Sequence, residues 1–436
     1  MEPVLSNILP AILWALLLSA AARYLPVFGR DMPVRMRFFG LFWLKLAVGT
    51  AVWAIYTYYY TDRQTSDIYR FFADAEVVYH TLSTHPRTYL HLVTGIGGHA
   101  ADLQPYLDAM NNWYKSFDDG FVNENRTLIR VNALLMPLTA GSYFGNMVIV
   151  CFVGVWAQAY LYAGLTRRFT GPPLLLFAAV NLWPSQLFWT SALMKEPLVM
   201  TGLAVTVGAA LRLKTKPFSA AAALLLAGGM LLTLFSKFYV GVALLFPVAA
   251  FLVVRDGAPV LQLAASYAGM TALLFLCAWG LGRVAPAYDI PTIIAAKQHA
   301  FTNVAEATKA GSAFYITPLE PSLGHMIQLS PTGIVNSLLR PFPGDAEGMM
   351  EWAAVAENLL FLGIAGLLLL NMKRGSMQRN PAAALLVFGL IILVLGGITV
   401  NISGALVRYK MPAVPYLTLA LLLVSRFNTP VREART

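Results

Sequence analysis

The chain has 436 residues, of which 58% are hydrophobic and only 12% are charged. This composition excludes an ordinary soluble protein and indicates an integral membrane protein. The formal net charge of +10 does not indicate a nucleic-acid partner, because the basic residues are scattered through short loops between apolar stretches. Both cysteines, Cys151 and Cys277, lie in apolar stretches, which argues against a disulfide framework or a cysteine-based zinc site.

About eleven apolar stretches approach or reach the length that crosses roughly 30 Å of hydrocarbon. They cover residues 4–25, 39–60, 143–165, 172–191, 197–212, 218–235, 240–254, 260–281, 353–371, 382–402 and 411–425. We therefore predict an all-α, polytopic transmembrane helical bundle that forms a single membrane domain over residues 1–436. Two long, partly helical loops interrupt it, at residues 61–142 and 283–352.

The short loops predict the orientation of the chain. They are rich in arginine and lysine, and the positive-inside rule places them in the cytoplasm. The N-terminus and both long loops are then extracytoplasmic and the C-terminus is cytoplasmic; in a bacterium, the membrane is the inner (plasma) membrane. The outer face receives all six histidines and every acidic residue except Asp31, Asp256 and Glu433. We expect the protein to work at that face.

The first long loop carries a candidate catalytic helix. Asp67, Arg70 and Asp74 follow each other at i, i+3 and i+7, which places them on one face of a helix. Phe71 and Phe72 belong to the apolar surface beside them. This pattern predicts a helix along the membrane interface, with its carboxylates toward a cavity and its aromatic residues toward lipid. The alternative is that Arg70 only neutralises the two acids on a solvated surface.

Other charged or aromatic residues return to the same predicted level of the membrane. Each alone is typical of a membrane-interface anchor. Together with Arg70, however, they are all predicted to lie at one side of the bilayer. Because arginine and lysine pair with phosphate oxygens, this clustering predicts a site for lipid phosphates or diphosphates. These residues are Lys195, Glu196, Lys237, Tyr239, Arg340, Arg408 and Lys410.

Three short motifs resemble those of multi-spanning GT-C-type glycosyltransferases. They are the acidic helix from Asp67 to Tyr79, the turn Pro184-Ser191-Lys195-Glu196, and the final entry Arg408-Tyr409-Met411-Pro412-Val414-Pro415. The resemblance covers the layout of spans over most of the chain, and a weaker resemblance links it to exopolysaccharide or O-antigen polymerases. One feature departs from the GT-C pattern: the acidic loop follows the second span, whereas family members usually carry it after the first.

The resemblance implies a reaction and a partner. Such enzymes take a sugar from a polyprenyl-phosphate carrier at the extracytoplasmic face, with an acid of the first external loop as the base. Carried over, Asp67 or Asp74 is that base, and Lys195, Lys237, Arg340 and Arg408 hold the carrier phosphate. The acceptor is a glycan, a lipid or a protein, in the synthesis of cell-envelope glycan or polysaccharide.

The chemistry of sugar transfer requires the same two kinds of group, a carboxylate and cations. Transfer of a sugar to a hydroxyl needs a carboxylate to take the acceptor proton. It also needs cations or a metal to stabilise the departing phosphate. A divalent cation remains possible as a cofactor, but no spacing in the sequence defines a metal site.

Two alternatives remain open. A lipid-linked oligosaccharide polymerase would use external arginines and the histidines, which are His80, His85, His91, His99, His299 and His325. A lipid or sugar transporter or flippase would carry ionisable residues at mid-membrane. Only Lys45 and Glu357 lie within apolar stretches, each near one end of its predicted span. This favours the enzyme over the transporter.

The second long loop contains a predicted helix over residues 295–311, with Gly311 as its C-cap. It would serve either as a lid over a membrane cavity or as a surface domain that shields the bundle.

Overall fold

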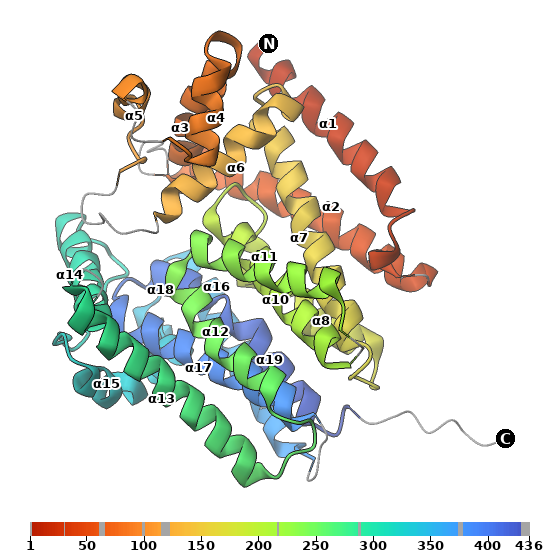
Figure 1. Cartoon of the computed structure of the whole chain (residues 1–436), viewed down its shortest axis with the longest axis vertical. Helices are drawn as coiled ribbons and strands as arrows, with labels where there is room; N and C mark the ends of the chain where they lie inside the picture. Colours follow the sequence, from red (N-terminus) through yellow and green to blue (C-terminus); the bar gives the residue numbers. More distant parts are fainter. Residues whose placement is uncertain are drawn as a thin grey trace. The chain divides into compact units, whose positions relative to one another are not determined.

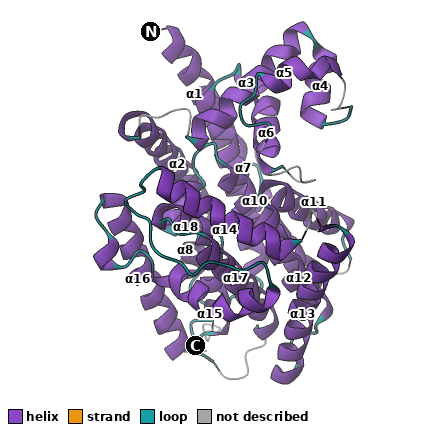
Figure 2. Cartoon of the chain, turned by 90° about the vertical axis from the view of Figure 1, so that its left-hand side faces the viewer, coloured by secondary structure: helices purple, strands orange, loops and turns teal. Residues whose placement is uncertain are grey.

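A computed structural model describes residues 2–29, 31–60, 66–97, 101–114, 123–215, 218–286, 289–373 and 378–428. His99 and Glu433, named above, lie outside these ranges. Helices make up the described residues almost throughout, and only two isolated β-bridges occur among them (Figure 2). The all-α prediction is therefore confirmed.

Six described helices are long and apolar enough to cross a membrane. They are Met32–Tyr59, Tyr143–Leu165, Lys195–Thr215, Val260–Val284, Met349–Leu370 and Arg379–Thr399. The pair Ser403–Lys410 and Ala413–Val424, bent by 46°, makes a seventh if it counts as one span. The chain is thus a helical membrane protein, whereas the predicted count of about eleven spans is not confirmed.

The predicted span at residues 172–191 is broken. It consists of α8 (Pro173–Asn181) and α9 (Pro184–Trp189). Pro184 has no N–H for an intrahelical bond, and its ring disfavours the helical conformation at Trp183. The break therefore follows from one residue, although the hydrophobicity of the stretch is continuous.

By its backbone contacts the chain groups into two compact units. The first comprises residues 1–163, 187–208 and 224–241, and the second comprises residues 164–186, 209–223 and 242–436. α9, α10 (Lys195–Thr215), α11 (Ala220–Ser236) and α12 (Phe238–Val253) each contribute residues to both units.

In the first unit, the first long loop folds into a helical layer. The elements before α9 are α1 (Glu2–Ala22), η1 (Pro26–Phe28), α2 (Met32–Ala54), the π-helical turn η2 (Ile55–Tyr59), α3 (Asp67–Thr84), α4 (Pro86–Thr94), η3 (Ala101–Leu103), α5 (Gln104–Asp108), α6 (Glu124–Thr139) and α7 (Tyr143–Leu165). α3 packs against α4 and α6 (Figure 1).

The packing of α3 corrects the prediction that its aromatic residues face lipid. Ile68, Phe71, Ala75 and Val78 recur at helical spacing and are fully buried within the unit. Phe72 is buried as well. The apolar face of α3 is therefore part of a protein core. The amphipathic pattern predicts the helix correctly, but such a pattern does not say whether lipid or protein covers its apolar face.

In the second unit, the remaining elements pack around α17 and α19. These elements are α8, α13 (Val260–Val284), α14 (Ile290–Ala307), α15 (Leu323–Leu339), η5 (Pro343–Asp345), α16 (Met349–Leu370), α17 (Arg379–Thr399), α18 (Ser403–Lys410) and α19 (Ala413–Val424). α14 ends at Ala307 rather than near Gly311, and Lys309 adopts a left-handed conformation with φ 46°. The predicted C-cap at Gly311 is wrong.

The second long loop is fixed to α17 by close backbone packing. A Cβ on Gly397 of α17 would lie 1.8 Å from the carbonyl oxygen of Gly333 on α15, so the two helices meet where neither has a side chain. Next to this crossing, Asn336 donates to the Gly397 carbonyl at 3.1 Å and Ser337 donates to the Leu393 carbonyl at 2.6 Å. α15 is thus an integral part of the second unit.

Candidate functional site

The acidic helix α3 places one carboxylate beside an arginine at its beginning. Asp67 lies in the first turn, where the helix dipole favours a negative charge. The guanidinium of Arg70 is 2.5 Å from its carboxylate, and the side chains of Asp67 and Arg70 are 17% and 35% exposed. Tyr69, on the same turn, shares a hydrogen bond with Thr57 of η2, which ties this end of α3 to the end of α2. Asp67 is therefore both fixed and accessible.

Asp74 has a different environment from Asp67. It is 3% exposed, and its two oxygens accept hydrogen bonds from the backbone N–H groups of Asn111 and Asn112, at 3.1 and 2.8 Å. Burial raises the pKa of the Asp74 carboxyl above its usual range, against the two backbone donors and the nearby Arg70, which favour the charged form. This geometry fits a residue that holds the 111–112 turn in place, and it leaves Asp67 as the more accessible of the two acids.

Lys195, at the start of α10, lies against the same α3 helix. Its ammonium is 2.7 Å from Oδ1 of Asn125, 3.6 Å from a carboxylate oxygen of Glu124, and 5.1 Å from the centroid of the Phe71 ring. The guanidinium of Arg70 lies 4.6 Å from the centroid of that ring. The first unit thus brings Asp67, Arg70 and Lys195 together around Phe71.

The start of α6 completes this group, although Glu124 and Asn125 were not predicted as site residues. Asn123 caps the helix by accepting from the Asn125 N–H at 3.0 Å, and Glu124 sits in the first turn. Glu124 also accepts from the N–H of Phe238, at the start of α12, at 3.2 Å. The sequence signal was available, because asparagine followed by an acid typically begins a helix.

Glu196 and Lys237 pair with each other in the interior of the first unit. Lys237 is the single residue between α11 and α12, and its ammonium lies 2.7 Å from Glu196, with the two side chains 6% and 1% exposed. A phosphate could reach either group only by breaking this pair. The geometry therefore favours a structural role for both. Tyr239 follows in the first turn of α12 and is half-buried.

The three remaining predicted phosphate ligands belong to the second unit. Arg340 is 2.9 Å from Asp345, and its guanidinium lies 4.3 Å from the centroid of the Phe314 ring. Arg408 is a half-buried residue of α18. Lys410, at the end of α18, is 4% exposed. The predicted set of cations is thus divided between the two units.

The ammonium of Lys410 is engaged by the protein itself. It donates to Oδ1 of Asn358 at 2.5 Å and to the carbonyls of Ser337 and Arg340 at 2.8 and 3.3 Å. Next to Asn358 on α16, Glu357 accepts from the N–H and hydroxyl of Ser185 at 2.7 and 2.5 Å. These contacts join α8–α9, α15, α16 and α18, which favours a structural role for Lys410.

The structure corrects the prediction that Lys45 lies near one end of its span. α2 begins at Met32 rather than near residue 39, so Lys45 lies in the middle of the Met32–Tyr59 helix and is 2% exposed. It donates to the hydroxyl of Thr190, in the non-helical residues 190–194 between α9 and α10. Gly49, one turn later, packs on the Ser191 carbonyl. A buried lysine thus faces a break in the helical backbone.

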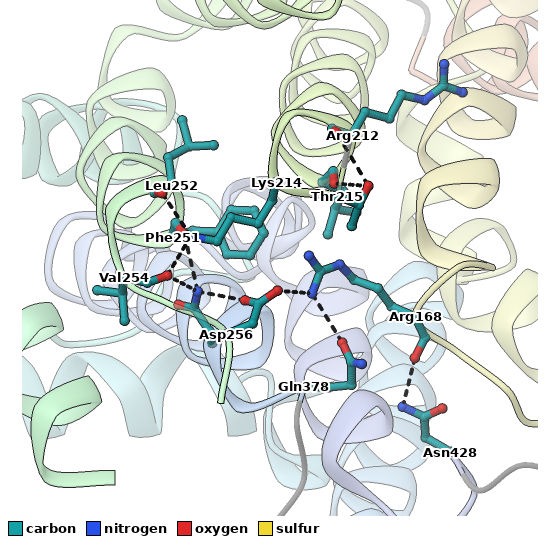
Figure 3. A network of polar contacts seen from close by, with 12 residues as sticks. Arg168, Arg212, Lys214, Thr215, Phe251, Leu252, Val254, Asp256, Gln378 and Asn428 are labelled. Carbon is teal, nitrogen blue, oxygen red and sulfur yellow. Dashed lines mark hydrogen bonds and ion pairs between the residues drawn. The ribbon is translucent and has the colours of Figure 1, made fainter. Parts of the chain in front are cut away.

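The predicted cytoplasmic loops of the second unit converge in a polar network (Figure 3). Arg168 donates to Asp256 at 2.9 Å and to Gln378 at 3.4 Å. Lys214 donates to the last carbonyls of α12, and Asn380 binds the second oxygen of Asp256 at 3.0 Å. Asn428 donates to the Arg168 carbonyl at 3.3 Å. Loops that the charge pattern assigned to one side of the membrane therefore lie together.

The histidines are not gathered into a site among the described residues. His80, His85 and His299 are exposed. Nδ1 of His91 contacts the Ile96 carbonyl of its own turn, and Nδ1 of His325 accepts from the N–H of Glu320. Nor does any group of three or more His, Cys, Asp and Glu side chains come together as metal ligands would in the described ranges.

Comparison with known proteins adds no family to these observations. No protein-family model matches the chain, and no curated protein matches it with significant similarity. The class is defined by the fold alone, as that of a helical membrane protein.

Proposed function

We propose that the chain is a membrane glycosyltransferase that moves a sugar from a polyprenyl-phosphate-linked donor to an acceptor at the extracytoplasmic face. The observation that carries the proposal is the group around Phe71. There, an accessible carboxylate, Asp67, pairs with Arg70, and Arg70 and Lys195 both lie against the Phe71 ring.

Each group has a chemical task in such a reaction. The carboxylate of Asp67 takes the proton of the acceptor hydroxyl as that oxygen attacks the anomeric carbon of the sugar. The bond between the sugar and the carrier phosphate breaks, and negative charge develops on the departing phosphate. The cations of Lys195 and Arg70 stabilise that charge. Arg70 also orients Asp67.

The eleven-span topology, with the N-terminus outside and the C-terminus in the cytoplasm, belongs to the same proposal. α11 and α12, of 17 and 16 residues, are apolar throughout and join at a single residue. Local thinning of the bilayer would let helices of this length cross. This arrangement directs the Asp67 face toward the leaflet from which a lipid-linked donor would arrive.

The test is sugar transfer from defined polyprenyl-phosphate sugars by the purified protein in proteoliposomes. A general base contributes about 10²–10⁴ in rate, so Asp67→Asn should abolish transfer while donor binding is retained. Asp102→Asn is the matched control, because Asp102 is an exposed acid of the same loop. Full transfer by Asp67→Asn would overturn the assignment of the base.

A transporter remains the second candidate, and Lys45 is the observation that favours it. Buried ionisable residues and interrupted helices characterise the substrate sites of transporters, and Lys45 faces the break at residues 190–194. A transporter would move a sugar-lipid across the bilayer without breaking a glycosidic or phosphate bond, and Lys45→Met should stop it. Retained translocation in this variant would exclude Lys45 from any such role. The polymerase alternative has no comparable observation in its favour.

A further inference from the structure

Two arginines lie one turn apart on α6 without an acidic partner among the described residues. Arg126 and Arg130 are at i and i+4, on one face of the helix, and both are half-buried. Like charges at this spacing destabilise a helix. Burial, with the proximity of Arg126, lowers the pKa of Arg130. The fold thus holds two cations close together although their repulsion destabilises the helix.

The orientation of both guanidinium groups is fixed through the same kind of contact. Nε of Arg126 donates to the Trp113 carbonyl and Nε of Arg130 donates to the Leu92 carbonyl, each at 3.0 Å. The two guanidinium carbons lie 5.3 and 5.2 Å from the centroid of the buried Trp113 indole. Each arginine is held through Nε and its contact with the indole, and among the described residues no hydrogen bond engages the terminal nitrogens of either one.

The surroundings of this arginine pair are suited to a sugar-bearing or lipid-bearing anion. Tyr114 is 51% exposed, and its ring centroid lies 5.6 Å from the guanidinium of Arg126. Asn125, the residue before Arg126, holds Lys195. α6 runs beside α3 and α4 in the first unit (Figure 1), so the pair and the Phe71 group share one helical layer.

We propose that Arg126 and Arg130 form a binding site for a phosphate or diphosphate group. Planar guanidinium groups bind phosphate oxygens through paired N–H donors, and two of them one turn apart can hold the oxygens of one diphosphate or two neighbouring phosphates. A bound phosphate between the two guanidinium groups would offset the repulsion between their positive charges. The site stands on these contacts alone, whatever reaction Asp67 performs.

Inorganic pyrophosphate is the first probe of this site. It should raise the unfolding temperature of the purified wild-type protein in detergent, saturably and beyond sodium chloride of equal ionic strength. Arg126→Gln and Arg130→Gln should each weaken its binding about tenfold or more. Arg87→Gln should not, since Arg87 is an exposed arginine of α4 in the same unit. An equal loss in the Arg87→Gln control would overturn the proposal.

A second measurement needs no variant and covers the possibility that the substitutions prevent folding. Pyrophosphate should protect Arg126 and Arg130 of the wild type from phenylglyoxal, while Arg87 stays reactive, as followed by peptide mass spectrometry. Unprotected Arg126 and Arg130 would overturn the proposal for a soluble ligand.

Nanodiscs of phosphatidylglycerol and of phosphatidylcholine distinguish the two sources of the phosphate. Protection of the pair in phosphatidylglycerol alone, with none by pyrophosphate, assigns the site to a lipid headgroup. Protection by pyrophosphate in both nanodiscs assigns it to a diphosphate. Protection by neither ligand refutes the site.

Discussion

The carboxylate of Glu196 and the ammonium of Lys237 lie 2.7 Å apart and are both almost fully buried. The pair joins the first turn of α10 to the junction of α11 and α12, so a loss of either charge leaves the other buried without its counter-ion. Removing one partner of a buried pair typically costs about 3–5 kcal/mol, whereas replacing both by apolar groups of similar volume is often neutral.

We therefore expect Lys237→Met and Glu196→Gln each to destabilise the protein by about 3–5 kcal/mol. The double variant Glu196→Leu with Lys237→Met should recover most of that loss. Thermal or denaturant unfolding in detergent measures the differences, and Lys373→Met, at an exposed lysine, serves as the control. Additive losses in the double variant would contradict the pairing.

The neighbours Arg167 and Arg168 provide a matched comparison for the network of Figure 3. Arg168 is 6% exposed and bonded to Asp256 and Gln378, whereas Arg167 is exposed. Because a charged hydrogen bond is worth about 1.5–3 kcal/mol, Arg168→Gln should lower the unfolding free energy by that amount. Arg167→Gln removes the same charge and should change it by less than about 0.5 kcal/mol. Equal losses of unfolding free energy in the two variants would mean that the net charge, and not the network, determines the effect.

Asp74 should make stability depend on pH in an unusual direction. Burial raises its pKa in the folded protein, so the folded state binds this proton more tightly than the unfolded state. The stabilisation that Asp74 adds to the unfolding free energy is then fully present below the ordinary aspartate pKa of about 3.9. It declines as the pH rises from there through the raised folded value.

The measurement is the difference in unfolding free energy between the wild type and Asp74→Asn across this pH interval. The wild type should lose stability relative to the variant as the pH rises. The opposite slope would mean that the two backbone N–H donors outweigh burial.

The topology can be tested by cysteine labelling after Cys277, the exposed native cysteine, is replaced. Gly311→Cys and Arg255→Cys introduce thiols at exposed positions in two loops of the second unit. In intact cells, an impermeant thiol reagent should label the cysteine at 311 and leave that at 255 unlabelled. The reverse pattern would invert the orientation and move the Asp67 face to the cytoplasm.

The sequence was sufficient to predict the elements that depend on local signals. The period of apolar residues predicts α3. The predicted stretches 197–212, 218–235 and 240–254 also place the start of α10 and the junction of α11 and α12 to within about two residues. The charge pattern assigned the loops of Arg168, Lys214 and Asp256 to one side of the membrane, and in the second unit these loops lie together.

The errors concern contacts between residues far apart in the chain. Asp74 could not be distinguished from Asp67 because its partners, Asn111 and Asn112, lie in another segment of the loop. Arg340 and Lys410 were grouped with Lys195 by their predicted depth in the membrane, and depth does not determine which helices are neighbours. The error at Lys45 was local, since Asp31 and Pro33 already indicate that the helix begins there.

Asn125 imposes a condition on how this protein can be produced. Asn125-Arg126-Thr127 has the form of an N-glycosylation acceptor, and the side-chain nitrogen of Asn125 donates to the Asn112 carbonyl at 3.0 Å while its oxygen holds Lys195. A glycan added to that nitrogen in a eukaryotic secretory pathway would remove a bond inside a buried position and force α6 away from α10. Expression in such a host should therefore yield misassembled material. Thr127→Val removes the acceptor while keeping Asn125, and it should restore assembly even though it loses the hydrogen bond from the Thr127 hydroxyl to the Phe235 carbonyl.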